Sequence, residues 1–434
     1  MPTWGIGMIG LALFVVLMAI GVRIFYASAL VGLLGIAAFV GLRPAEGAAG
    51  YMLYTFLSKY DFSVIPLFIL MGFFAYYAGI SEDLFYSARK LVGHVHGGLP
   101  IATALGCAGF AACSGSSVAS AALMSKLAIP EMLKDGVHPR LATGVVAAAG
   151  TLASLIPPSV LMVVYGIVAD QSIGKLLMGG YVPGLLTVVL YSLMIYTRCR
   201  INPKLAPPLT PVPWKERFAS LKFVWSMFIV VVLIMGGLYT GVFTASEAGG
   251  MGAIGTLVIL IARGKASWSI MKASIMGTGE TTFMSFGVML GMFFMNVFLS
   301  LSGFTDTVTG AILESGLNRY IVYSVFILVY LFLGMFIGAI GMVMITVPFF
   351  LPVMMALGFD PIWFGIIVVK MAEIAMITPP VGMTVFVVHA VRKEIPTMEI
   401  FKGCMPFFYM EIVTTVILTI FPQIVTWLPD MMVK

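Results

Sequence analysis

Long apolar runs constrain this chain more than any other feature, because each run is about as long as a lipid bilayer is thick. A helix needs about 20 apolar residues to cross the hydrocarbon core, and a spanning segment must satisfy its own backbone hydrogen bonds. Only 10% of the 434 residues are charged and 61% are hydrophobic, whereas about a quarter are charged in a soluble domain. The sequence therefore predicts an all-α polytopic membrane protein, with about ten spanning helices at residues 5–22, 24–41, 61–80, 141–168, 178–197, 222–241, 247–262, 278–301, 360–390 and 404–428.

Two of these runs contain adjacent prolines, Pro157-Pro158 and Pro379-Pro380. A proline removes a backbone donor and clashes with the preceding turn, so both runs should be broken helices. Two more apolar stretches, 101–133 and 320–357, are interrupted by glycine-rich segments and are predicted to be re-entrant hairpins. Irregular backbone at membrane depth is tolerated only inside protein or beside a wet cavity, so these four interruptions indicate a functional site.

The two halves of the chain match at an offset of 222 residues, which predicts an internal repeat. Five crossings lie between the two hairpins, so the second copy is expected to be inverted, an architecture typical of secondary transporters. The matched positions are Pro130 with Pro352, Gly136 with Gly358, Pro139 with Pro361, and Pro157-Pro158 with Pro379-Pro380.

The repeat divides the chain into two domains joined by a basic, proline-rich linker. The first repeat is predicted to comprise 1–197, with scaffold helices within 1–80, a hairpin at 101–133, a broken helix at 141–168 and a helix at 178–197. The linker is 198–221. The second repeat is predicted to comprise 222–434, with scaffold helices at 222–262, a helix at 278–301, a hairpin at 320–357, a broken helix at 360–390 and a helix at 404–428.

The basic residues predict the orientation, because cytoplasmic loops carry an excess of Lys and Arg. Placing the linker inside puts eighteen of the 24 Lys and Arg residues in the cytoplasm and both termini in the periplasm. This bias explains the net charge of +6 without a nucleic-acid partner. The outside then receives Arg43, Lys59, Lys175, Arg319 and Lys434.

The hairpin turns are expected at "CSGSSVAS" (Cys113–Ser120) and near "GAIGMVMIT" (Gly338–Thr346). Freed carbonyls, hydroxyls and half-helix ends at such interruptions can hold a cation and an anionic substrate group. Serine and glycine also serve close helix packing, but their placement at two related interruptions favours ligand binding. Oxygen ligands of this kind suit a hard cation such as sodium.

Two ionisable residues, Lys370 and Glu373, lie one turn before the second break and share a helix face. They form either a mutual ion pair or a site at which Lys370 holds an organic anion. Lys126 is expected to extend to the cytoplasmic surface instead. The four histidines and four cysteines form no metal-ligand or disulfide pattern, and a membrane enzyme would need such a cluster. No catalytic residue is predicted.

Five segments together resemble the large membrane subunit (DctM-like permease) of TRAP, or tripartite ATP-independent periplasmic, transporters. They are "GFAACSGSSVASAAL", "IPEM", "LATGVVAAAGTLASLIPPSVLMVVYG", "ADQSIGKLLMGGYVPGLL" and "ITPPVGMTVFVV". The resemblance implies an elevator-type transporter of the bacterial inner membrane that uses sodium ions to import an organic acid. It also implies two protein partners, a small four-helix membrane subunit on a separate chain and a periplasmic substrate-binding protein.

The same resemblance implies where the ligands bind, with the substrate between the two hairpin tips. Sodium would be held by Ser114, Gly115, Ser117, Thr151, Pro157, Pro158, Gly338, Gly341, Thr378, Pro379 and Gly382. Substrate contacts are expected from Ser116, Ser159, Thr346, Lys370, Glu373 and Val381.

One position departs from the family pattern. Many members carry an acidic residue where "GMFIG" here places Gly338, so the second ion site would rely on Glu373 or on main-chain ligands instead. A stand-alone sodium- or proton-coupled carboxylate symporter or antiporter of similar fold is the alternative that the residues leave open.

Overall fold

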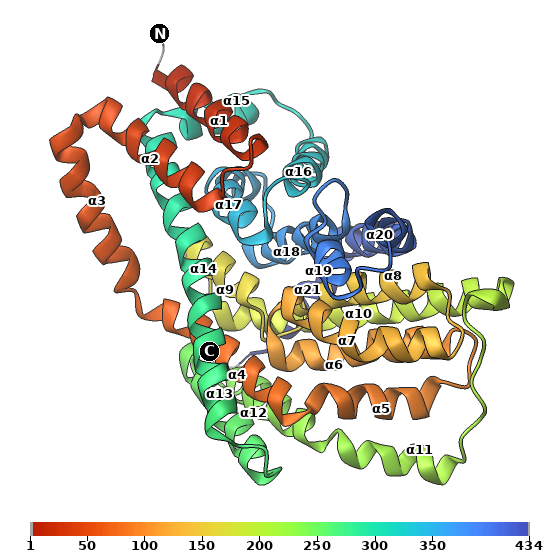
Figure 1. Cartoon of the computed structure of the whole chain (residues 1–434). Coiled ribbons are helices and arrows are strands. Elements are labelled where there is room, and N and C mark those ends of the chain that lie inside the picture. The colour runs from red at the N-terminus through yellow and green to blue at the C-terminus, as the bar shows by residue number, and fades with distance from the viewer. Residues whose placement is uncertain (1–2, 433–434) are drawn as a thin grey trace.

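The computed structural model describes residues 3–432 and contains only helices and irregular segments over that range (Figure 1). Lys434, which the charge bias places outside, lies beyond the described residues. The first half contains α1 (Thr3–Ala19), α2 (Ile24–Val40), α3 (Leu42–Leu57), α4 (Val64–Ala78), α5 (Ile80–Val92), α6 (Gly98–Ser114), α7 (Ser117–Lys134), α8 (Pro139–Thr151), α9 (Val160–Ala169) and α10 (Ile173–Ile201).

The linker contains one short helix, α11 (Trp214–Ser220). The second half again places a hairpin before a broken helix. It comprises α12 (Trp225–Tyr239), α13 (Ala245–Ala262), α14 (Trp268–Leu301), α15 (Phe304–Glu314), α16 (Arg319–Gly334), α17 (Ala339–Ala356), α18 (Pro361–Ile377), α19 (Met383–Val391), α20 (Thr397–Ile420) and α21 (Gln423–Asp430). The hairpins are therefore α6 with α7 and α16 with α17, and the broken helices are α8 with α9 and α18 with α19.

The packing of the two halves is also equivalent. Helix α2 lies along α14, and its counterpart α13 lies along α4. Each hairpin contacts the short half-helix of the opposite repeat, so α7 packs against α19 and α17 packs against α9. The two halves are thus interlocked through their hairpins.

The half-helices begin at capping residues that the sequence supplies. The Ser159 hydroxyl accepts a hydrogen bond from Met162 N at the start of α9, and the Asp360 carboxylate accepts one from Trp363 N at the start of α18. Proline occupies the first position of both α8 and α18, where its missing N–H costs nothing. Both helices are buried along nearly their whole length, so each leads into its break from inside the protein.

Six helices are individually long and apolar enough to cross a bilayer, and a seventh results if α11 and α12 act as one bent span. The six are Tyr60–Ala78, Ile173–Ile201, Ala245–Ala262, Trp268–Leu301, Ala339–Ala356 and Thr397–Ile420. Five further apolar helices of 10–17 residues are α1, α2, α6, α9 and α16. Together with the shorter runs, these helices make a multi-span membrane protein.

Several boundaries differ from the sequence prediction. Helices α3, α5 and α15 were not expected, because their polar residues lower the local hydropathy. They form helices nevertheless, since their apolar residues recur at helical spacing. Helix α3 extends away from the body at the edge of Figure 1. The run 404–428 is two helices that separate at Phe421-Pro422, since proline cannot continue a helix. The division into two repeat domains stays a prediction.

Candidate functional site

The tip of the first hairpin rests directly on the first helix break. Helix α6 ends at Ser114, and Gly115 turns the chain in the left-handed region with a φ of 60°. A Cβ atom on Gly115 would lie 2.8 Å from the carbonyl oxygen of Pro158. Only glycine combines this backbone angle with so close an approach, so the tip and the break form one unit.

This unit gathers neutral oxygen atoms in a buried space. The Ser117 hydroxyl lies 2.7 Å from that of Ser154 and 3.2 Å from the carbonyl oxygen of Thr151. Ser159 donates to the carbonyl oxygen of Ser154 at 2.5 Å. The buried hydroxyl of Ser114 has no hydrogen-bond partner among the described residues. A buried polar atom without a partner is uncommon, and an oxygen set of this kind fits a hard cation such as sodium.

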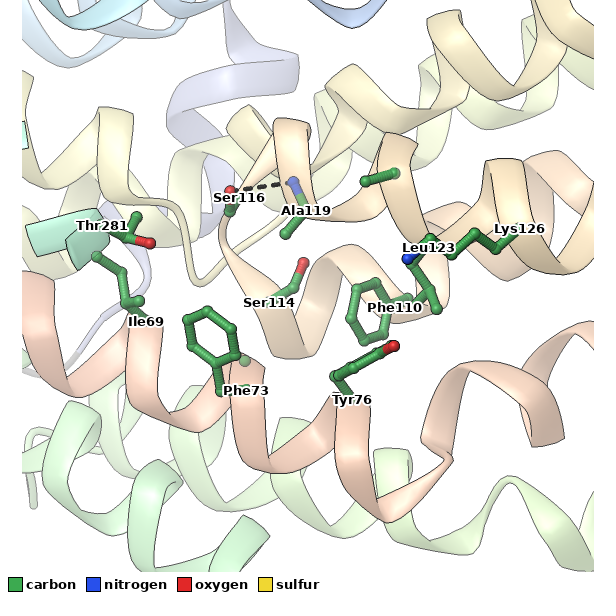
Figure 2. A pocket seen from close by; sticks show the side chains of 12 residues that line it. Ile69, Phe73, Tyr76, Phe110, Ser114, Ser116, Ala119, Leu123, Lys126 and Thr281 are labelled. Carbon is green, nitrogen blue, oxygen red and sulfur yellow. Dashed lines mark hydrogen bonds between the residues drawn. The ribbon is translucent and has the colours of Figure 1, made fainter. Parts of the chain in front are cut away.

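A cavity of about 160 Å³ lies against the same tip (Figure 2). It is walled by α4 and α14 on one side and by the first hairpin on the other. Its volume corresponds to about five water molecules. The lining residues include Phe73, Tyr76, Phe110, Ser114, Ser116, Lys126 and Thr281.

The cavity has a positive character. In Figure 2 the Lys126 side chain runs back along α7 toward the cavity rather than away from it. No carboxylate among residues 3–432 forms an ion pair with Lys126. Ser116 caps the N-terminus of α7, whose free N–H groups add to the positive potential. The cavity can therefore hold a small anion.

The second tip is less polar and more open. The turn falls at Met335–Gly338, earlier than expected, so Gly341 and Thr346 belong to α17. A Cβ on Gly338 would lie 3.3 Å from the end of the Met383 side chain and 4.0 Å from the end of the Ile24 side chain. At the break, Thr378 donates to the Ile374 carbonyl oxygen at 2.6 Å.

The exposure of the second break differs from that of the first. Pro379, Pro380 and Val381 are exposed, whereas Pro157 and Pro158 are buried. Gly382 ends this segment with a φ of 51° and lies against Phe401. The second tip therefore supplies an accessible backbone rather than a closed cluster of oxygens.

The residues predicted to contact substrate lie in different places. Ser116 lines the cavity, Ser159 caps α9 inside the first break, and Val381 is exposed at the second break. The Thr346 hydroxyl is buried and donates to the Tyr330 hydroxyl at 2.8 Å. Among these residues only Ser116 lines the cavity. Their roles in substrate binding stay predictions.

Lys370 and Glu373 are fully buried and paired with each other at 2.8 Å. A second carboxylate, Glu411 of α20, lies 2.5 Å from the Lys370 ammonium. Of the two interpretations left open by the sequence, this arrangement favours the ion pair, because the ammonium is enclosed and does not line the cavity.

Sequence reasoning missed the contributions of Lys126 and Glu411. Lys126 was expected at the cytoplasmic surface; it is exposed, and its long side chain also lines the cavity, which the sequence did not predict. Glu411 lies within a run of apolar residues, and an ionisable residue at membrane depth is a signal that could have been used.

These features define a class: a helical membrane transporter built from two hairpins and two broken helices. A solved structure supports the fold, since the YdaH transporter of Alcanivorax borkumensis, described as having an unusual topology, superposes with a TM-score of 0.62. The alignment covers 88% of this chain and 89% of that one at 15% identity, so it shows the fold alone.

The family is established by sequence comparison. The family described as "Tripartite ATP-independent periplasmic transporter, DctM component" matches residues 11–424. The C4-dicarboxylate TRAP transporter large permease protein DctM of Pseudomonas aeruginosa is 36% identical, over 86% of each chain. The sialic acid TRAP transporter large permease protein SiaM of Vibrio cholerae is 30% identical, over 86% of this chain and 87% of that one. The chain belongs to the DctM family and is a large permease subunit of a TRAP transporter, a multi-span protein of the inner membrane.

Proposed function

We propose that this protein is the translocation subunit of a sodium-coupled importer of a small organic acid. The observation that carries the proposal is the buried pair of hydroxyls of Ser117 and Ser154 beside a hairpin tip whose unpartnered Ser114 lines a cavity together with Lys126. A cation in the cluster and an anion in the cavity would stabilise each other, since both would touch the same hairpin tip. Coupling follows, because each ligand binds better when the other is present.

The proposed cations are sodium ions that are bound by uncharged oxygen atoms. The first would be held by Ser114, Ser117 and the Thr151 carbonyl oxygen. The second would use main-chain oxygens around Thr378–Gly382, because Gly338 supplies no carboxylate there.

The substrate proposed for the cavity is a small carboxylate. Relatives include a C4-dicarboxylate permease and a sialic acid permease, by their names, and both of these compounds are organic acids. Ser116 and the α7 N-terminus would bind the carboxylate, and Lys126 would add charge. Lys370 and Glu373 are not included in the proposed substrate site, because they are buried in contact with Glu411.

The proposed movement is an elevator step. The cavity lies between the first hairpin and the helices α4 and α14, so a hairpin unit that slides along this boundary would carry its ligands across the membrane. A small membrane subunit and a periplasmic binding protein would complete the transporter, with both termini of this chain in the periplasm. One relative, from Oleidesulfovibrio alaskensis, is named an isethionate TRAP transporter permease protein DctMQ, and this chain covers 64% of it.

The test is uptake of a labelled organic acid by proteoliposomes that contain this chain and its small subunit. Uptake should require both an inward sodium gradient and the loaded binding protein. Uptake without the binding protein would instead support a stand-alone symporter. The variant Lys126→Met should lower uptake about tenfold, the effect of about 1.4 kcal/mol of lost anion binding. Lys134→Met, on the same helix, is the matched control because Lys134 does not line the cavity.

A further inference from the structure

A group of ionisable side chains lies fully buried where α10, α18 and α20 meet. Lys370 and Glu373 come from α18, Glu411 comes from α20, and Thr187 and Tyr191 come from α10. The Lys370 ammonium contacts both carboxylates, at 2.8 Å and 2.5 Å, and donates to the Thr187 hydroxyl at 2.9 Å. None of these five side chains lines the cavity of Figure 2.

The charges of this cluster do not balance. One ammonium faces two carboxylates, which leaves one negative charge in excess if all three are ionised. All three side chains are fully excluded from solvent. A buried uncompensated charge is strongly disfavoured, so two carboxylates that share one site hold a proton between them.

The polar contacts differ between the two carboxylates. Glu411 accepts a hydrogen bond from the Tyr191 hydroxyl on Oε1, and its Oε2, which has no hydrogen bond, lies 2.5 Å from the Lys370 ammonium. Glu373 accepts only from Lys370, on Oε2, and its buried Oε1 has no partner. Glu411 thus has a Tyr191 hydrogen bond in addition to its contact with Lys370, and the carboxylate with the additional donor is the one that remains ionised.

We propose that the Lys370–Glu373–Glu411 cluster is a proton-binding site that holds one exchangeable proton on Glu373. The proton is taken up from water as Glu373 is neutralised and returned to water when Glu373 ionises. Glu373 lies about one turn before the Thr378 break on the same helix. Proton loss leaves a buried negative charge there, so proton occupancy would stabilise the segment that leads into the second break.

The other ionisable groups around α18 do not compensate this charge. Tyr165 of α9 donates to the Pro361 carbonyl oxygen at the far end of α18, and Tyr330 of α16 is bonded to Thr346. On α20, Cys404 is buried near Tyr191, and Glu399 pairs with Arg140 of α8. His389 of α19 contacts the Ile395 carbonyl oxygen. Asp430 of α21 is exposed, and α17 has no ionisable side chain.

Infrared spectroscopy of the purified protein tests the proposal by counting protonated carboxyl groups. Each protonated glutamic acid gives a C=O stretch distinct from that of a carboxylate. We expect one buried group in the wild type at neutral pH. Glu373→Gln and Glu411→Gln should each have none, because each leaves a balanced pair, and Lys370→Met should have two. The control Glu46→Gln, an exposed position, should leave the count unchanged.

A wild-type protein without this band, or a band that persists in both glutamine variants, would overturn the proposal. If Lys370→Met does not fold, the two glutamine variants still decide, since both keep an ammonium paired with one carboxylate. The thermal midpoint of the wild type should fall as the pH rises and the proton is lost, and that of Glu411→Gln should fall less. The link to transport rests on the proposed function, and complete absence of uptake would contradict that function without changing the infrared count.

Discussion

The two hairpin tips have equivalent places in the repeat but differ in chemistry. The first is closed, with serine hydroxyls and the Thr151 carbonyl oxygen gathered under Gly115. The second is open, with Gly338 facing a methionine side chain and the Val381 side chain 40% exposed. The comparison indicates that the backbone is interrupted at equivalent places in both halves, while the side chains decide how closed and how polar each interruption is.

The largest expected difference is in how readily a soluble reagent reaches the two helix breaks. The four native cysteines are all buried, so single introduced cysteines can be compared by maleimide labelling in detergent. We expect Val381→Cys to label at least about a hundred times faster than Ser159→Cys, because a buried position reacts only through local opening. Equal rates would show that the first break is as open as the second. In the presence of sodium, Ser159→Cys should still react slowly with maleimide.

The second comparison concerns the two tip glycines. Gly115→Ala should lower uptake at least about tenfold, because it places a side chain at positive φ and 2.8 Å from the Pro158 carbonyl oxygen. Gly338→Ala should change uptake less than about twofold, since its φ of −62° is ordinary and the nearest atom is flexible. Elution of both variants as single detergent-solubilised species excludes misfolding. A larger loss in Gly338→Ala would reverse the comparison.

Removal of a side-chain hydroxyl should affect sodium binding more at the first proposed ion site than at the second, and this difference should be smaller than that between the two glycine variants. Ser117→Ala removes contacts to Ser154 and to the Thr151 carbonyl oxygen, and we expect the half-saturating sodium concentration to rise about fivefold, the effect of about 1 kcal/mol. Thr378→Ala should raise it less than about twofold, because main-chain oxygens remain at that break. Sodium dependence of uptake at saturating substrate measures both. An unchanged value in Ser117→Ala would remove Ser117 from the ion site.

The smallest effect is expected from restoring charge to the second tip. Gly338→Asp would add a carboxylate near the exposed break, and we expect the half-saturating sodium concentration to fall about threefold, or about 0.6 kcal/mol. Gly338→Asn is the matched control, because it adds a similar side chain without charge. An equal change in both variants would mean that the carboxylate is not responsible.

The sequence predicted the repeat because proline and glycine act locally, through missing donors and permitted angles. Pro157-Pro158 and Pro379-Pro380 interrupt their helices as expected, and the serine tip lies against the first break. The position of the second turn was displaced because "GAIGMVMIT" is compatible with helix, and only packing fixes where α17 begins. The enclosure of Lys370 could not be predicted, since it depends on Glu411, which is 41 positions away.

Lys126 illustrates a different limit of sequence reasoning. A basic residue near the end of a hairpin arm is expected to reach the surface, because its stem can follow apolar groups while the ammonium reaches water. Lys126 is exposed as expected, but the cavity that it also lines could not be predicted, because part of the wall comes from a distant part of the chain, such as Thr281 on α14.

The contact of each hairpin with the opposite repeat has a consequence for biosynthesis. Helix α7 emerges from the ribosome about 250 residues before α19, its packing partner, which at about 5–20 residues per second is a delay of about 12–50 seconds. During this interval α7 lacks its packing partner from the second repeat. A ribosome that stalls within the second repeat would leave a membrane-inserted fragment in which this face of α7 has no partner.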